Sequence, residues 1–384
     1  MTSGSAVDPT YWEYIGLDRL LTLQGGVDGG GEVDSADELH FIVIHQAIEL
    51  VFKLVLRELR ETRGALLSPR VDESAIPDVA MHMGRVNEAL GVTAAHFAFM
   101  ETLGTQGFLS FRDKLGTSSG AQSFQMREME ELLGLPRAER ERILRRLKAE
   151  IEDPEAVRAF EGFVLEPLAA ITRRIERQIA DKRAEGVDDA PDRFTADYLR
   201  RVEADLREKG SLRDALEQWL FRTPICGSSP EPGASGDRSV VRAFVGDYLE
   251  RGEAAGWSAG QVAGAKAFLQ GTEAAPLDWR AERIRAALLF IEVYSDLPLL
   301  AWPRILLERL VELESRLVDF RNGHARMVER VIGDRPGTGG SAGIRYLDLT
   351  RDARVFPELT QVRGLLLPRE RRAHFAGIEM YDFA

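Results

Sequence analysis

Apolar residues recur at spacings of three and four along most of the chain, as they do in helices that bury one face. No run alternates β-branched and polar residues between turn residues, which is the pattern of a strand. The sequence therefore predicts an all-α helical bundle. The predicted helices cover about 10–22, 36–64, 76–103, 121–135, 137–151, 154–184, 193–222, 238–270, 278–294 and 299–333.

Two connections rich in glycine, at 25–31 and 227–236, interrupt the helical pattern. Between about 136 and 237 the predicted helices become strongly charged, which indicates broad solvated faces. Because apolar helices lie on both sides of this segment, we interpret 1–384 as a single domain with a charged helical insertion. Residues 1–9 are small and polar, and we expect them to be disordered.

The charge balance restricts the partners. The 50 Lys and Arg against 62 Asp and Glu give 384 residues a net charge of −12, which repels nucleic acid and anionic membranes. The one cysteine, Cys226, cannot form an internal disulfide, and the N-terminus lacks a secretory signal pattern. We therefore expect a cytoplasmic protein without nucleic-acid or membrane partners.

The most apolar long segment, 41–56, is interrupted by four polar residues, His45, Gln46, Glu49 and Lys53. It falls short of the roughly 20 apolar residues that span a bilayer, so it is predicted to be a buried helix. His45 lies in its middle and shares a face with Phe41, so its imidazole should point into a core or cavity. A core histidine bonded to a backbone carbonyl or to Glu49 and a functional histidine both fit this position.

His324 begins a helical stretch whose other members on the same face are aliphatic, among them Val328. An imidazole on an aliphatic helix wall is the type of residue that ligates a haem iron axially. An ordinary helix residue is the alternative. No HExxH pair or His-rich tract indicates a structural zinc site.

A glycine-rich loop over 335–343 follows Gly333, the predicted C-cap of this helix. The loop lacks the P-loop pattern, since no Gly-Lys-Ser/Thr follows and no strand precedes it. It suits close backbone approach to a flat or anionic ligand, to which Thr338 would add a hydroxyl. A flexible linker is the alternative.

The stretch 108–122 offers a further set of polar groups. Ser119 and Gln122 have capping-box spacing, which predicts a helix start whose free amides would face a ligand carboxylate or propionate. Arg112, one turn after Phe108, would fork onto a carboxylate in an aromatic site. An ion pair at the surface, with Asp113 or a nearby glutamate, is the alternative for this arginine.

Together these segments resemble the tryptophan 2,3-dioxygenase family, the haem enzymes of kynurenine formation. The resemblance rests on four blocks in the same order, which lie within 11–18, 39–50, 111–123 and 321–347. It covers roughly 10–135 and 280–365 and leaves the charged middle segment largely unmatched. It implies an all-α fold that encloses a b-type haem.

The resemblance also implies roles for individual residues. His324 matches the axial ligand of the haem iron, and the other positions near the haem are Arg321, Ser119 and Gly120. His45, the candidate catalytic residue, matches the distal histidine that accepts a hydrogen bond from the substrate indole N–H. The remaining substrate-binding positions are Tyr11, Tyr14, Phe41, Phe108, Arg112, Leu115 and Thr338.

In this scheme Arg112 binds the substrate carboxylate, and Thr338 lies beside the carboxylate and ammonium. Tyr11 and Tyr14 match tyrosines that reach a neighbouring subunit's site, which implies a homo-oligomer, normally a tetramer. The sequence departs from the family at Val51-Phe52, at Phe320 and at Ala121, where larger aromatic residues are usual. The lost volume would admit a ring- or β-substituted tryptophan.

The leading hypothesis is a haem-dependent dioxygenase that cleaves the indole C2–C3 bond of L-tryptophan with dioxygen and forms N-formylkynurenine. A haem-dependent monooxygenase acting on tryptophan or a β-methyl tryptophan in a natural-product pathway is the alternative within the enzyme class. A haem-binding sensor without turnover is a third reading, but such a protein needs neither Arg112 nor His45.

Overall fold

The computed structural model describes residues 8–27, 29–69, 71, 74–116, 118–150, 168–227, 235–338, 343–375 and 378–381. Parts of the predictions fall on 1–7, 151–167, 228–234 and 339–342, which lie outside the described residues. Every regular element in the described ranges is helical, and extended residues form only two isolated bridges. The all-α prediction is confirmed.

The α-helices are α1 (Tyr11–Ile15), α2 (Leu17–Leu20), α3 (Ala36–Leu67), α4 (Ala75–Met100), α5 (Thr105–Phe111), α6 (Phe124–Leu133), α7 (Arg137–Glu150), α9 (Leu168–Glu185), α10 (Ala190–Lys209), α11 (Leu212–Arg222), α12 (Ser235–Ala254), α13 (Ala259–Gln270), α14 (Trp279–Val293), α15 (Ala301–Ile332), α16 (Ile344–Thr350) and α17 (Pro357–Arg363). The 3₁₀ turns are η1 (Glu101–Leu103), η2 (Arg112–Leu115), η3 (Gly120–Gln122), η4 (Pro298–Leu300), η6 (Arg369–Arg371) and η7 (Ile378–Tyr381).

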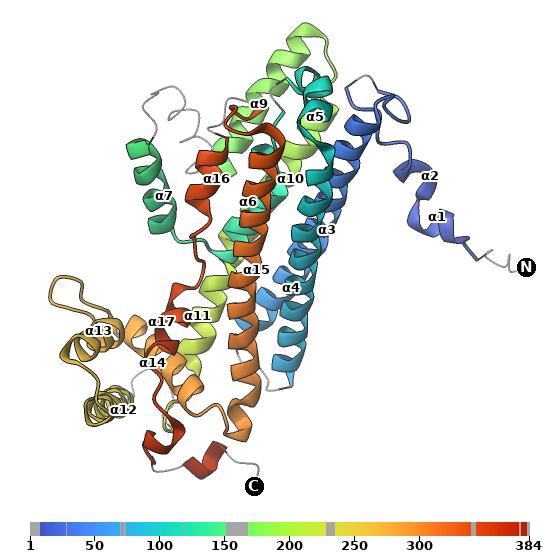
Figure 1. The fold of residues 1–384 in the computed structure, drawn as a ribbon. Coiled ribbons are helices and arrows are strands. Elements are labelled where there is room, and N and C mark those ends of the chain that lie inside the picture. Colours follow the sequence, from blue (N-terminus) through green and yellow to red (C-terminus); the bar gives the residue numbers. More distant parts are fainter. Residues whose placement is uncertain are drawn as a thin grey trace, which may run out of the picture.

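Three long helices form the centre of the protein: α4 packs against both α3 and α15 (Figure 1). The Ser35 side chain starts α3 by accepting a hydrogen bond from the Glu38 amide, as an N-cap does. Gly333, at φ 60°, ends α15, which confirms the predicted C-cap. Both α3 and α15 are 32 residues long, so they supply two extended walls.

Among the described helices, α3 is the one whose length and composition would allow it to cross a membrane. In the structure it packs against α4, α6 and α11 in the interior, and side chains such as Phe52, Val55 and Leu59 are buried. The prediction of a buried helix therefore holds for one face of α3 only, because Val43, Leu50 and Leu54 are exposed.

The predicted helix 10–22 is divided into α1 and α2 at Gly16, which adopts φ 62°. Two longer predicted helices are also divided. The span 193–222 becomes α10 and α11, because Gly210 adopts φ 70° and Ser211 forms a capping box with Asp214. The span 238–270 becomes α12 and α13, because Gly256 adopts φ 94° and Ser258 caps α13. The apolar periodicity continues across both breaks, which hid them in the sequence.

The predicted helix start at Ser119 is wrong. Ser119 precedes the 3₁₀ turn η3, and its amide donates a 3.4 Å hydrogen bond to the Gln122 side chain. Helix α6 begins at Phe124 instead, where the Ser123 hydroxyl accepts from the Met126 amide at 3.1 Å.

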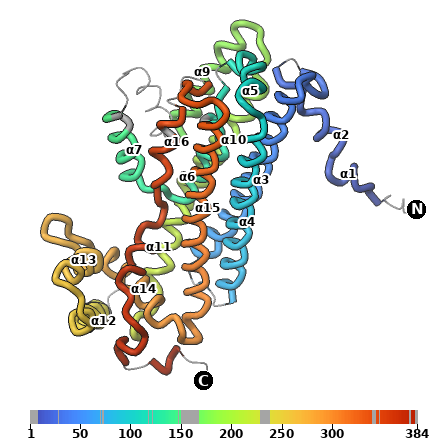
Figure 2. Tube along the Cα trace, in the orientation of Figure 1, coloured from blue at the N-terminus to red at the C-terminus, as the bar shows by residue number. Residues whose placement is uncertain are grey.

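Three parts of the chain extend from the central helices. Helices α1 and α2 form an arm at the N-terminal side, and α12 and α13 form a lobe beside α14 (Figures 1 and 2). Within the charged segment, α9 and α10 pair around a small apolar cluster that includes Leu168 and Leu199. The buried Arg63 of α3 joins this pair to the core through an ion pair with Asp205.

Candidate active site

A cavity of about 260 Å³ lies between α3, α4, α6 and α15 and is bordered by the segments 108–120 and 337–350. It gathers nine of the predicted site residues from five separate stretches of sequence. They are Phe41, His45, Phe108, Arg112, Ser119, Gly120, Arg321, His324 and Thr338. Long-range folding therefore assembles one site from these stretches.

His45 is held by its own helix. Its Nδ1 lies 2.8 Å from the Phe41 carbonyl oxygen, which can only accept, so Nδ1 carries the proton of the neutral ring. Burial lowers the pKa of His45 below its ordinary value, which keeps the ring neutral. The other nitrogen, Nε2, is then an acceptor for an N–H group in the cavity.

His324 is held by packing. Its ring stacks on Phe97 of α4 with centroids 5.2 Å apart and an interplanar angle of 11°. Gly323 permits this approach, because a Cβ there would lie 3.1 Å from the Phe97 Cδ2 atom. Burial, followed by the nearby His45, lowers the pKa of His324 to about 4, so the imidazole is a neutral nitrogen donor.

Aromatic rings surround His45 on the distal side of the cavity. The Phe41 ring lies 4.1 Å from the His45 ring, 5.9 Å from Phe108 and 5.5 Å from Phe111, centroid to centroid. Tilted rings at these distances form an apolar wall suited to another flat ring. Phe320, at one of the positions where the family usually has a larger aromatic residue, packs between Phe52 and Phe97.

Arg112 offers one nitrogen to the cavity. Its Nη2 donates a 2.5 Å hydrogen bond to the Pro336 carbonyl, which joins η2 to the glycine-rich loop. Its Nη1 is buried and has no hydrogen-bond partner among the described residues. A buried, unpaired N–H of a guanidinium is costly, so this atom indicates an anionic ligand. The predicted alternative, an ion pair with Asp113, is not what the structure shows.

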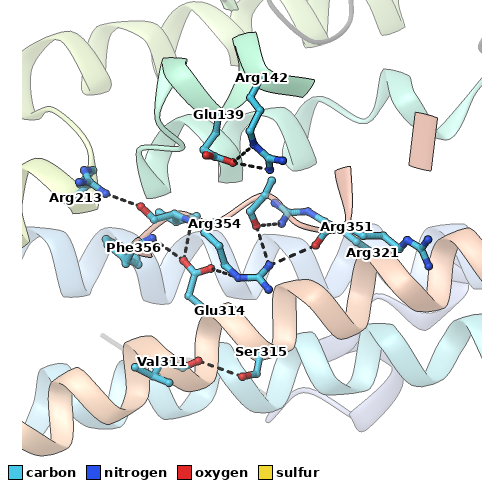
Figure 3. A network of polar contacts seen from close by, with 12 residues as sticks. Glu139, Arg142, Arg213, Val311, Glu314, Ser315, Arg321, Arg351, Arg354 and Phe356 are labelled. Atoms are coloured by element: carbon cyan, nitrogen blue, oxygen red, sulfur yellow. Dashed lines mark hydrogen bonds and ion pairs between the residues drawn. The ribbon is translucent and has the colours of Figure 1, made fainter. Parts of the chain in front are cut away.

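Arg321 is fixed from behind by a polar network (Figure 3). Its Nη1 donates to the Ala353 carbonyl at 2.8 Å. Two turns earlier on α15, the Glu314 carboxylate accepts from the Val355 and Phe356 amides, both at 2.7 Å. These contacts attach segment 353–356 to α15, and Arg321 lines the cavity beside it.

Three predicted residues do not line this cavity. Leu115 packs against the apolar core next to it instead. Tyr11 and Tyr14 lie on the exposed α1 arm. The Ala121 side chain, expected to enlarge the pocket, lies outside the described part of the structure.

The sequence reasoning missed a charged edge of the cavity. Arg127 and Glu130 of α6 form a 2.8 Å ion pair there, and Glu49 of α3 also borders the space. The spacing of Arg127 and Glu130 by three residues was the available signal. It indicates only that the two share a helix face, because nothing in the sequence places that face at the cavity.

These residues fit a haem. The neutral imidazole of His324 shares the cavity with Val328, Val331 and Phe320, so it would hold the haem iron in apolar surroundings. Arg321 and Arg127 border the same space and carry the charge that propionates require. Among the described residues, no three His, Cys, Asp or Glu side chains gather to bind a bare metal ion.

The fold and the cavity together define an all-α protein with an aromatic-walled cavity that contains two neutral histidines and a buried arginine nitrogen. A family model described as tryptophan 2,3-dioxygenase matches residues 2–209 and 275–366. The chain belongs to this family, whose members are haem-dependent dioxygenases. The family model thus matches most of the predicted insertion at 136–237. The unmatched stretch 210–274 overlaps only residues 210–237 of that insertion.

Several relatives carry the same description. A tryptophan 2,3-dioxygenase of Sorangium cellulosum is 41% identical, over 94% of this chain and 84% of that protein. Tryptophan 2,3-dioxygenase 2 of Ralstonia nicotianae is 37% identical over 93% of each chain. A tryptophan 2,3-dioxygenase-like protein of Xanthomonas campestris is 36% identical, over 72% of this chain and 98% of its own.

Proposed function

We propose that this chain is a haem-dependent enzyme that cleaves the indole C2–C3 bond of L-tryptophan with dioxygen, inserts both oxygen atoms and forms N-formylkynurenine. The observation that carries the proposal is one pair of atoms in one cavity. His45 presents an acceptor nitrogen, and Arg112 presents an unpaired N–H. An indole N–H and an α-carboxylate are the complementary groups of tryptophan.

His324 would hold the haem b iron, and Arg321 and Arg127 would meet its propionates. The residues at the turn, Ser119 and Gly120, border the same space. When bound, the haem supplies the binding and activation of dioxygen. The apolar walls exclude water from this chemistry.

The protein's own contribution is orientation. The Phe41 and Phe108 rings would pack against the indole, and His45 Nε2 would accept its N–H proton in a hydrogen bond. Arg112 Nη1 would bind the carboxylate, with Thr338 beside it. Fixing both ends of the substrate holds C2 and C3 in one place. Such positioning lowers the activation free energy by several kcal/mol in favourable cases, and by about 7–11 kcal/mol at most.

We also infer a homo-oligomer, with a tetramer as the expected form, in the cytoplasm. Three aromatic side chains of the α1 arm are strongly exposed: Tyr11 at 72%, Trp12 at 58% and Tyr14 at 81%. Large exposed aromatics on one short segment favour contact with another subunit. This supports the assignment of Tyr11 and Tyr14 to a neighbouring site.

The deciding experiment combines reduced protein, L-tryptophan and isotopically labelled dioxygen under single-turnover conditions. Mass spectrometry of the product should show a gain of two labelled oxygen atoms. A gain of one atom would establish the monooxygenase alternative instead. Absence of product from haem-loaded protein would contradict both and leave the sensor hypothesis.

A further inference from the structure

A second cavity, of about 240 Å³, lies where α11, α14 and α17 meet. It shares no lining residue with the first cavity. Six of its lining residues are apolar: Leu216, Leu220, Ile284, Leu288, Phe356 and Leu359. Its α11 residues belong to the stretch that the family model leaves unmatched, so this cavity is not explained by the proposed function.

Most of the other residues that line the second cavity are charged, and several of these charges pair with one another. Arg213 pairs with Glu358 at 2.5 Å and with Glu217 at 3.0 Å. Asp278 caps α14 by accepting a 2.8 Å hydrogen bond from the Ala281 amide. The exposed Arg280 lies with its guanidinium 5.3 Å from the Phe221 ring.

Arg280 forms no ion pair among the described residues and is exposed. Arg285 also forms none, but it is half-buried. Its Nη1 donates to the Phe268 carbonyl at 2.6 Å, and its guanidinium lies 5.0 Å from the Phe268 ring centroid. Within the described residues it forms no ion pair, and Glu358 and Glu217 act on it only at longer range. Half-burial lowers the pKa of Arg285, because the charge is partly removed from water.

A guanidinium without an ion pair and an apolar lining complement one kind of molecule. We propose that the second cavity is a binding site for a small carboxylic acid with an apolar body. The carboxylate would lie on Arg285, and the body would pack against Leu216, Leu288 and their neighbours. A neutral molecule would leave Arg285 without a counter-charge, and an inorganic anion would leave the apolar side uncovered.

Isothermal titration calorimetry with 3-phenylpropionate tests this site. The measurement uses the full chain carrying Arg112→Ala, so that the carboxylate partner of the first cavity is removed. Arg285→Gln should weaken binding about 10- to 150-fold, the range expected for losing a charge-assisted hydrogen bond. Arg285→Lys, which keeps the positive charge, should retain more affinity than the glutamine variant.

Arg242→Gln is the matched control, because Arg242 is an exposed arginine that pairs with Glu282 of α14 outside the cavity. It should leave the affinity unchanged. The neutral analogue 3-phenylpropanamide should bind the parent weakly, and L-phenylalanine shows whether an ammonium group is also accepted. Equal affinity of the acid for the parent and Arg285→Gln, or no binding to the parent, would overturn the proposal.

The calorimetric test requires neither haem nor oxygen. Failure of this second site therefore leaves the proposed dioxygenase function intact, and failure of the dioxygenase function leaves the binding result valid. Circular dichroism of each variant shows whether it is folded before the titration. A folded Arg285→Lys variant keeps the comparison usable if Arg285→Gln does not fold.

Discussion

The two walls of the first cavity hold their histidines by different means. The distal wall, formed by α3 and 108–112, fixes polar groups through backbone carbonyls: Phe41 for His45 and Pro336 for Arg112. The proximal wall, formed by α15 and α4, fixes His324 by stacking its ring on Phe97.

This difference has a chemical consequence. A carbonyl bonded to Nδ1 selects one tautomer, so His45 has one nitrogen left and that nitrogen is an acceptor. Stacking on Phe97 fixes the plane of the His324 ring without engaging either nitrogen. The distal wall is therefore suited to orienting a substrate, and the proximal wall to presenting a ligand nitrogen to iron.

The substitution with the largest expected effect distinguishes the role of the proximal wall from that of the distal wall. His324→Ala should lose most of the bound haem, because His324 is the one proposed protein ligand to the iron. His45→Ala should retain haem and serves as the control. Haem content per chain is measured by the pyridine haemochrome assay. Full haem occupancy in His324→Ala would reverse the roles assigned to the two walls.

Arg112→Ala should raise KM for L-tryptophan about 10- to 150-fold, which corresponds to roughly 1.5–3 kcal/mol for a charge-assisted hydrogen bond. Its haem content should remain close to that of the parent. Steady-state kinetics with tryptophan and tryptamine check this. If the parent uses both substrates equally well, Arg112 has only its structural contact with Pro336.

His45→Ala should have a smaller effect than Arg112→Ala. Losing one neutral hydrogen bond should reduce the free energy of substrate binding by about 0.5–1.5 kcal/mol, and the indole should also be less well aligned. The informative quantity is the kcat/KM ratio of tryptophan to its N1-methyl analogue, which should move toward one in the variant. An unchanged ratio would show that His45 does not contact the indole nitrogen and is a core histidine.

The smallest effect concerns the stacking of the proximal histidine. Gly323→Ala gains helix propensity of about 1 kcal/mol but pushes on Phe97, and overpacking costs about 1–3 kcal/mol, so a small net loss of stability is expected. Gly64→Ala, at a helical position with open space around it, should stabilise by up to about 1 kcal/mol. Urea unfolding of both variants measures the difference between their free energies of unfolding. Equal stabilisation by the two substitutions would mean that Phe97 does not constrain α15.

Sequence patterns predicted the long helices well, because α3 and α15 contain enough turns for a clear apolar face. Helices α5, α16 and α17 have seven residues each, too few for a periodic signal, and were missed. The capping box at Ser119 shows the same limit, since a local motif is used equally by a 3₁₀ turn.

For the site, the resemblance to a family predicted the residue types, and the structure shows which residues these side chains contact. The stack of Phe97 on His324 joins residues far apart in sequence through a contact that depends on how α4 packs on α15. Similarly, Arg112 was considered with nearby Asp113, whereas its partner is Pro336, 224 positions away. Such pairings follow from tertiary packing and carry no local signal.

The segment 347–359 belongs to both cavities. Leu347 and Thr350 border the first, Phe356 and Leu359 border the second, and Glu314 holds the amides between them. Thermodynamic linkage makes any influence along this segment reciprocal. If an acid in the second cavity changes tryptophan affinity by some factor, tryptophan changes the affinity for that acid by the same factor. If the shared segment transmits such an influence, the two binding constants belong to one coupled equilibrium.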